Sequence, residues 1–117
     1  MGLWHHSLLA RDHPKKEARH LMATAGQSVT LAKNGRKRVE EKGDPAAIRA
    51  HFKEHAWNTL EIIAQGETLT QIINGVEFSS VTDRDGEVSR RKGHIALQDH
   101  GKGCVVAFRR IRLKTGP

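Results

Sequence analysis

The pair Asn74-Gly75 restricts the fold more than any other local feature, because it stands between two runs of residues that each favour a β-strand. Asn and Gly both tolerate the positive backbone φ that a two-residue type I′ turn needs at its two central positions. The pair therefore predicts an antiparallel hairpin of strands 67–73 and 76–81.

The register of this hairpin follows from the length of its turn. A two-residue turn places Ile73 opposite Val76. Two positions further along each strand, Gln71 lies opposite Phe78. One side of the hairpin is thus the more apolar, and we expect Gln71 to be set among apolar neighbours.

Further runs of alternating residues predict more strands, with turn residues between them. Asn34-Gly35 separates two of these runs and predicts a second hairpin with a two-residue type I′ turn. The second run of that hairpin is basic, which is typical of a solvated edge strand. The apolar positions change parity within the last run, which predicts a bulge near Arg109 and Arg110. Several short strands of this kind favour an all-β fold, an antiparallel β-sandwich. The additional strands are predicted over 28–33, 36–41, 57–64, 93–98 and 104–114.

One short helix is expected after Asp44, which can cap it, and Pro45 suits its first turn. His51 and His55 follow, four residues apart, a spacing that could bind a metal ion. No third ligand accompanies them, so the sequence favours a solvated helix face and predicts no metal site.

Composition narrows the class of protein. The chain has 117 residues, of which 37% are hydrophobic and 28% charged, and this suits one globular domain and not a membrane protein. Its single cysteine excludes an intrachain disulfide, and its first residues do not resemble a signal peptide. The net charge of +7 favours acidic partners, but the lack of Tyr argues against nucleic-acid binding. We expect a poorly defined segment over 1–24 and the domain itself over 25–117.

Five short motifs are informative through their order and spacing. They are Trp57-Asn58, Ile62-Ile63-Ala64-Gln65-Gly66, Ile73-Asn74-Gly75, Gly93-His94-Ile95-Ala96-Leu97-Gln98-Asp99-His100-Gly101 and Phe108-Arg109-Arg110-Ile111-Arg112-Leu113-Lys114. Together they resemble the 3-keto-disaccharide hydrolase family, from about residue 25 to the C-terminus. The resemblance implies a concanavalin-like jelly roll made of two antiparallel sheets.

The resemblance also implies a shortened domain, because family domains are longer and begin with strands that precede the part seen in this chain. A truncated jelly roll would expose apolar faces and unpaired sheet edges, so that the chain would form a homo-oligomer, bind another polypeptide or be marginally stable. Alternatively, residues 3–9 supply a substitute strand. Family members are typically exported, while this chain carries no recognisable signal peptide, so its location is left open.

The chemistry implied by the resemblance is cleavage of 3-keto glycosides without a cofactor. A base removes the acidic C2 proton, the C1 leaving group departs by elimination, and water then adds. Such a site needs a general base and a hydrogen-bond donor for the enolate oxygen. We expect His100 to be the base or a substrate contact, and Asp99 to orient His100 or to act as the base. For both residues, the alternative is an ordinary turn at a strand end.

Four further residues are candidates for binding the sugar. Gln71 and Gln98 could hydrogen-bond hydroxyl groups, and Arg109 offers a fork of donors. Trp57 could stack on a sugar ring, although its position at a strand start favours a core role. Gln71 and Arg110 stand where family members often carry a His or Lys and an Asn, respectively, and the first departure removes a titratable group. A carbohydrate-binding or interaction module and an inactive fragment are therefore alternative functions.

Overall fold

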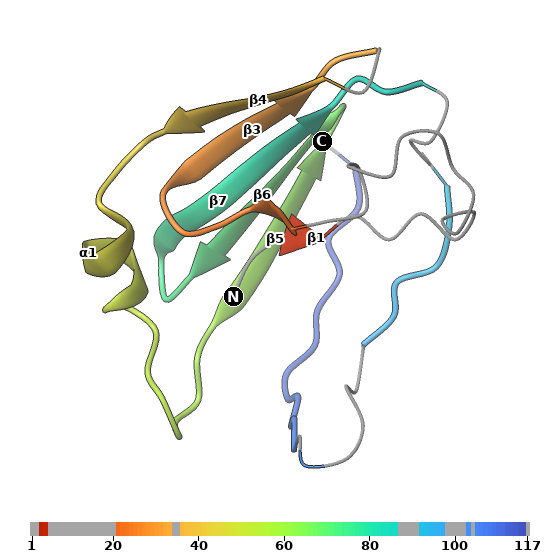
Figure 1. Ribbon diagram of the computed structural model, residues 1–117. Coiled ribbons are helices and arrows are strands. Elements are labelled where there is room, and N and C mark those ends of the chain that lie inside the picture. The colour runs from red at the N-terminus through yellow and green to blue at the C-terminus, as the bar shows by residue number, and fades with distance from the viewer. Residues whose placement is uncertain are drawn as a thin grey trace.

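The computed structural model describes residues 3–4, 21–33, 36–86, 92–97, 103 and 105–116. Their centre is a five-stranded sheet in the order β4-β3-β7-β6-β5 (Figure 1). Its strands are β3 (Gln27–Leu31), β4 (Lys37–Glu41), β5 (Leu60–Gln65), β6 (Thr68–Ile73) and β7 (Val76–Asp83). A separate pair joins β1 (Leu3–Trp4) to β2 (Leu21–Ala23), and the helix of the described part is α1 (Pro45–Arg49).

The turn between β6 and β7 forms as the sequence predicts. Asn74 and Gly75 have φ values of 50° and 82°, so both lie in the left-handed region that a type I′ turn requires. Ile73 pairs with Val76, which confirms the register next to the turn.

A bulge changes the pairing beyond that point. The register shifts between Gln71 and Ile72, so Gln71 pairs with Ser79, and the predicted pairing of Gln71 with Phe78 is wrong. The extra residue on β7 allows two successive side chains to face the same side of the sheet. Phe78 and Ser79 are accordingly both buried. The shift serves packing, since it brings the Phe78 ring into the same buried cluster as Ile73.

The hairpin of β3 and β4 forms with a register that differs from the predicted one. Leu31 pairs with Lys37, whereas a two-residue turn at 34–35 would place Leu31 opposite Arg38. The expectation of a two-residue connection is therefore wrong, while residues 34 and 35 lie outside the described residues. All five residues of β4 are exposed, which confirms a solvated edge strand.

Two findings correct the predicted antiparallel sandwich. β3 and β7 pair in parallel, so the sheet is mixed. The strands expected over 93–98 and 104–114 do not form in the described residues 92–97 and 105–116, which join no sheet and whose side chains are exposed. The described residues thus show a mostly β fold with one mixed five-stranded sheet and one short helix, and show neither a sandwich nor a jelly roll.

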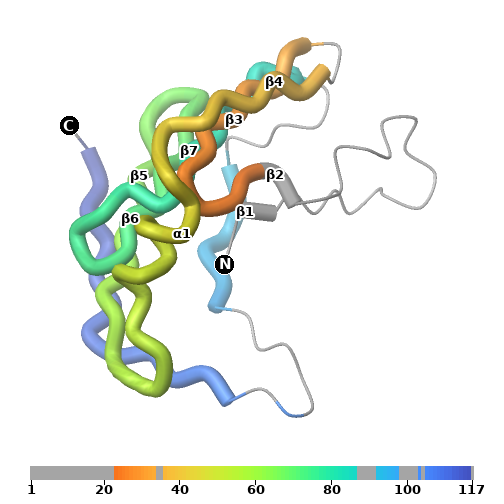
Figure 2. The backbone as a smooth tube through the Cα atoms, turned by 60° about the vertical axis from the view of Figure 1, so that its left-hand side comes forward, coloured from red at the N-terminus to blue at the C-terminus, as the bar shows by residue number. Residues whose placement is uncertain are grey.

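The core lies on one face of the sheet. Its buried side chains form two clusters, one of Ala23, Val29, Leu31 and Val81, and one of Ala25, Ile73 and Phe78, against which Ile48 packs. Figure 2 shows β2 on one side of the sheet, and both views show residues 105–116 running along its β5 side. Asp44 begins α1 as predicted, because its carboxylate accepts hydrogen bonds from the backbone N–H groups of Ala46 and Ala47 at 3.0 and 3.3 Å. Within the described part of the chain, no helix has the length and apolar character needed to cross a membrane.

Candidate functional site

The two faces of the sheet differ in chemistry. One face, here the hydroxyl face, carries side chains of β3, β7 and β6 that lie opposite one another, namely Ser28, Thr30, Ser80, Thr82, Thr68 and Thr70. Two hydrogen bonds of 3.0 Å close within it, one between the Thr68 and Thr82 hydroxyls and one from Ser80 Oγ to Ser28 Oγ. The opposite face, here the apolar face, carries the buried clusters and, at its β5–β6 end, Leu60, Ile62, Leu69, Gln71 and Ile73. Because several hydroxyl groups satisfy one another, Gln71 on the apolar face is the stronger candidate for binding a ligand.

Gln71 is a buried polar side chain among apolar ones, as the sequence predicts. Its exposure is 5%, and its Oε1 accepts a hydrogen bond from Ser79 Oγ at 3.4 Å. Within the described residues its amide nitrogen has no hydrogen-bond partner. A buried donor left unpaired costs about 1–3 kcal/mol, so such groups point to a ligand, a water or a chain segment that completes them. The neighbouring Ile62 and Leu69 remain exposed, so the cover over Gln71 does not extend to these two side chains.

Trp57 and Arg109, two of the predicted site residues that the structure describes, are in direct contact. The Cζ atom of Arg109 lies 3.9 Å from the centroid of the Trp57 ring, a cation–π arrangement. Trp57 is 50% exposed, so the core role that its position favoured is wrong. The contact joins the loop before β5 to the extended segment 105–116, two parts of the chain far apart in sequence.

A network of asparagine hydrogen bonds holds the loop that carries Trp57. Asn74 Nδ2 donates to Asn58 Oδ1 and to the His51 carbonyl, both at 2.7 Å, and its Oδ1 accepts from the Thr59 N–H at 2.9 Å. Asn58 in turn exchanges hydrogen bonds with the backbone of Lys53 at 2.7 and 2.8 Å. The network ties the loop to the β6–β7 turn and so gives Trp57 a defined position. Sequence reasoning quoted both asparagines as motif residues but missed this role, because the pairing is tertiary.

The described candidates do not gather at a single point. Gln71 pairs with Ile62 on β5, five residues beyond Trp57, which corresponds to about 16 Å along an extended strand. Gln98, Asp99 and His100 lie outside the described residues, which end at Leu97 on that side. The structure therefore brings Trp57 and Arg109 together, and it leaves Gln71 at a separate place on the apolar face.

Other titratable groups lie elsewhere. Lys42 donates a hydrogen bond of 2.8 Å to Glu40, and this bond and the lysine charge lower the pKa of the Glu40 carboxyl below its ordinary value. Glu40 belongs to edge strand β4, at the far side of the sheet from β5. Asp85, which follows β7, is fully buried, and its N–H donates to Asp83 Oδ1 at 2.9 Å. Among the described residues, no three His, Cys, Asp or Glu side chains are grouped so that they could hold a metal ion.

Comparison with known proteins gives one match. The family model described as the 3-keto-alpha-glucoside-1,2-lyase-like domain matches residues 9–114. No curated protein and no solved structure matches the chain significantly. The match covers both the sheet and the extended segment 105–114, and it includes Gln71, Trp57 and Arg109.

Proposed function

The chain belongs to the family of 3-keto-alpha-glucoside-1,2-lyase-like domains, and from this premise we propose that it cleaves 3-keto glycosides by proton abstraction, elimination and hydration. The family match over residues 9–114 is the observation that carries the proposal. The buried Gln71 side chain supports it, because its amide nitrogen lacks a hydrogen-bond partner among the described residues.

The reaction follows from the acidity of the substrate. The C3 ketone acidifies the proton on C2, and a general base takes that proton while the ketone oxygen gains negative charge. The electron pair then forms the C1–C2 double bond and expels the C1 oxygen, which takes up a proton as the free alcohol. Addition of water to the enone completes a net hydrolysis, and without that step the reaction is a lyase reaction.

The proposed site residues act on different parts of the substrate in this scheme. His100 is the general base, and Asp99 orients its imidazole or serves as the base itself. The Gln71 amide nitrogen donates to the enolate oxygen or to a neighbouring hydroxyl, and Gln98 binds a second hydroxyl. Trp57 and Arg109 contact a more distant part of the glycoside.

The direct test is to incubate the purified chain with a 3-keto disaccharide and to measure the released monosaccharide. We expect release by the wild type and a loss of about 100-fold or more in His100→Gln, the range that a general base contributes. Absence of release by the wild-type chain, under conditions where another member of the family is active, would overturn the proposal.

Gln71→Leu provides the sharper variant, because it removes the unpaired amide at nearly constant volume. We expect little net change in stability, since an unsatisfied buried donor disappears while the buried Ser79 hydroxyl loses its acceptor at 3.4 Å, together with reduced turnover. Gln65→Leu, at the exposed end of β5, is the matched control and should retain full activity. Equal turnover in Gln71→Leu and in the wild type would remove Gln71 from the site.

A non-catalytic carbohydrate-binding module is the second candidate function. The exposed Trp57 ring, held by the asparagine network, favours it, because aromatic rings at a fixed position stack on sugar faces. Saturable binding of the keto-disaccharide without any turnover would support this alternative over the first.

A further inference from the structure

We propose that residues 105–116, together with Trp57, form a binding site for an acidic saccharide, so that the glycosides bound by this chain carry carboxylate groups. The choice of a saccharide rests on the proposed function. The charge preference rests on the arrangement of cations described next, and on no feature of the catalytic scheme.

The segment is a continuous stripe of positive charge. Arg109, Arg110, Arg112 and Lys114 fall within six residues, and 105–116 contains no acidic residue. All four side chains are exposed, and within the described part of the chain none of them forms a salt bridge. Cations without protein counter-ions at such close spacing attract an anionic ligand.

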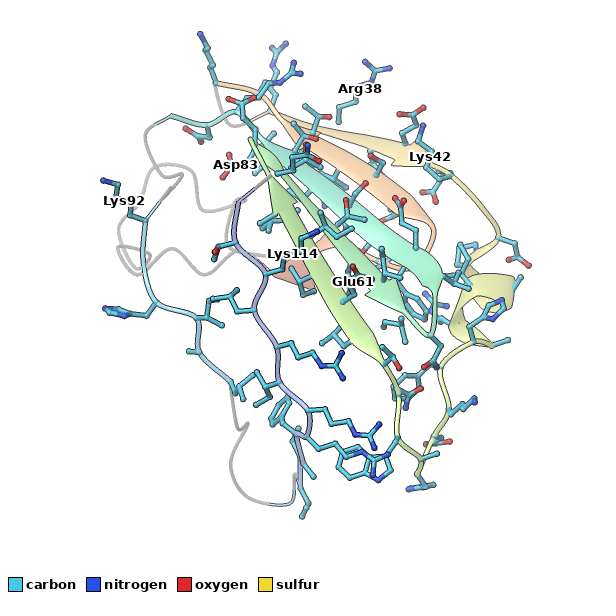
Figure 3. The ribbon with its side chains drawn as sticks, turned by 180° about the vertical axis from the view of Figure 1, so that it is seen from behind. Arg38, Lys42, Glu61, Asp83, Lys92 and Lys114 are labelled. Atoms are coloured by element: carbon cyan, nitrogen blue, oxygen red, sulfur yellow. The ribbon has the colours of Figure 1, made fainter. Side chains whose placement is uncertain are left out.

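The backbone arranges these charges in a row. Beyond the bend at Arg110 the segment joins no sheet, and Arg112 and Lys114 are two residues apart, a spacing that in an extended stretch places both side chains on the same side, about 6.5 Å apart. Figure 3 shows Lys114 on this segment beside the sheet, and it shows Arg38 and Lys42 at the opposite side of the sheet. A ligand that repeats a carboxylate along its length can therefore meet more than one cation of the row.

The Arg109 side chain, at one end of the row of cations, is held in place by its contact with Trp57. Its guanidinium stacks on Trp57 at 3.9 Å, and the loop of Trp57 is tied down through Asn58 and Asn74. Stacking uses the flat face of the guanidinium and leaves its N–H edge free to bind a carboxylate with two parallel hydrogen bonds. Because the side chain is already held, less conformational entropy is lost on binding.

An acidic saccharide fits this surface better than a nucleic acid. Proteins that bind single strands offer successive aromatic rings for base stacking, and here the ring of Trp57 already carries Arg109 on one face. The nearby Glu54 and Glu61 are exposed and, within the described residues, form no salt bridge, which weakens the field that a dense polyphosphate would need. A sparser row of carboxylates tolerates these charges.

The test uses tetragalacturonate, which has no 3-keto group and is bound without being cleaved. Isothermal titration should show saturable binding by the wild type, weaker at about 0.15 M than at about 0.01 M ionic strength. Arg110→Gln/Arg112→Gln should bind about tenfold more weakly, and Trp57→Leu should also bind more weakly. Arg38→Gln/Lys42→Gln, which removes the same charge at the opposite side of the sheet (Figure 3), should stay within about twofold.

Three outcomes would overturn this proposal. They are no binding of tetragalacturonate, equal binding of neutral maltotetraose, and tighter binding of single-stranded DNA with the same dependence on Arg110 and Arg112. Turnover of a neutral 3-keto disaccharide is measured in parallel. If that turnover persists while tetragalacturonate does not bind, the charge preference fails and the proposed function stands.

Discussion

Strand β7 and the segment 105–114 have similar sequence patterns, but β7 belongs to the sheet and the segment joins no sheet. Both carry alternating apolar residues with one change of parity, after Phe78 in β7 and after Phe108 in the segment. In β7 that change is a bulge, and the strand is paired on both sides, with β3 and with β6. In the segment it is a bend at Arg110, whose φ is 55°, and no sheet includes these residues.

The difference shows that an alternating pattern of apolar residues favours a strand but does not by itself place that strand in a sheet. β7 lies between two strands whose backbones hydrogen-bond with its N–H and C=O groups, and its Phe78 and Val81 side chains are buried. The segment is held in the described structure by the contact of Arg109 with Trp57, and its Ile111 and Leu113 stay exposed. A partner backbone, and not the pattern alone, decides which of the two outcomes occurs.

The largest expected effect is the loss of stability when a core side chain of the sheet is truncated. Ile73→Ala should lower the free energy of unfolding by about 2–4 kcal/mol, because Ile73 is fully buried against Phe78. Ile111→Ala removes the same atoms from the exposed segment and should change stability by no more than about 0.5 kcal/mol. Urea denaturation of both variants measures the contrast, and a large loss in Ile111→Ala would show that the segment packs as β7 does.

Loss of the asparagine network should have the next largest effect. Asn74→Ala removes hydrogen bonds to Asn58, His51 and Thr59, and should cost about 1–3 kcal/mol. Quenching of Trp fluorescence by acrylamide should change as well, since the loop of Trp57 is released from the turn. Glu77→Ala, exposed on the same hairpin, is the control and should leave both readouts unchanged.

Strand β5, which pairs with β6 on one side and ends the described sheet on the other, offers a test of whether such an edge associates with a second chain. All six of its residues are exposed and it ends the described sheet, so we propose that two copies of the chain associate through it. Light scattering should detect this association, and Ile62→Lys should weaken it by about tenfold, since charge on an edge opposes pairing. Val39→Lys, on the already charged edge β4, should have no effect, and association that survives Ile62→Lys would exclude β5 as the contact.

The smallest expected effect concerns Glu40, whose pKa is lowered by Lys42. A lowered pKa in the folded state means that the pair stabilises the fold above the ordinary glutamate pKa and that this contribution is lost as the pH falls through the folded value. Because the Glu40 side chain is exposed, the change in melting temperature between Glu40→Gln and wild type should be close to the detection limit at every pH. NMR titration of the Glu40 carboxyl checks the direction, and a midpoint above the ordinary value would contradict it.

In the candidate site, as in the fold, some features follow from the local sequence and others depend on tertiary contacts. Gln71 was predictable as a polar residue on an apolar face, because alternate residues of a strand share a side. The roles of Asn58 and Asn74 were not predictable, since their hydrogen bonds join residues 16 positions apart. Trp57 was misjudged because a position at a strand start does not reveal that a bend leaves its ring half exposed beside Arg109.

Local chemistry in the sequence determined the Asn74-Gly75 turn, the cap at Asp44 and the solvated character of β4, because each depends on the φ preferences, hydrogen-bonding groups or charges of neighbouring residues. Tertiary structure alone decided the parallel pairing of β3 with β7, the bulge at Phe78 and the unpaired state of 105–114. These features depend on which backbone lies beside which and on how side chains from distant segments fill the core, and no pattern within a single segment carries that information.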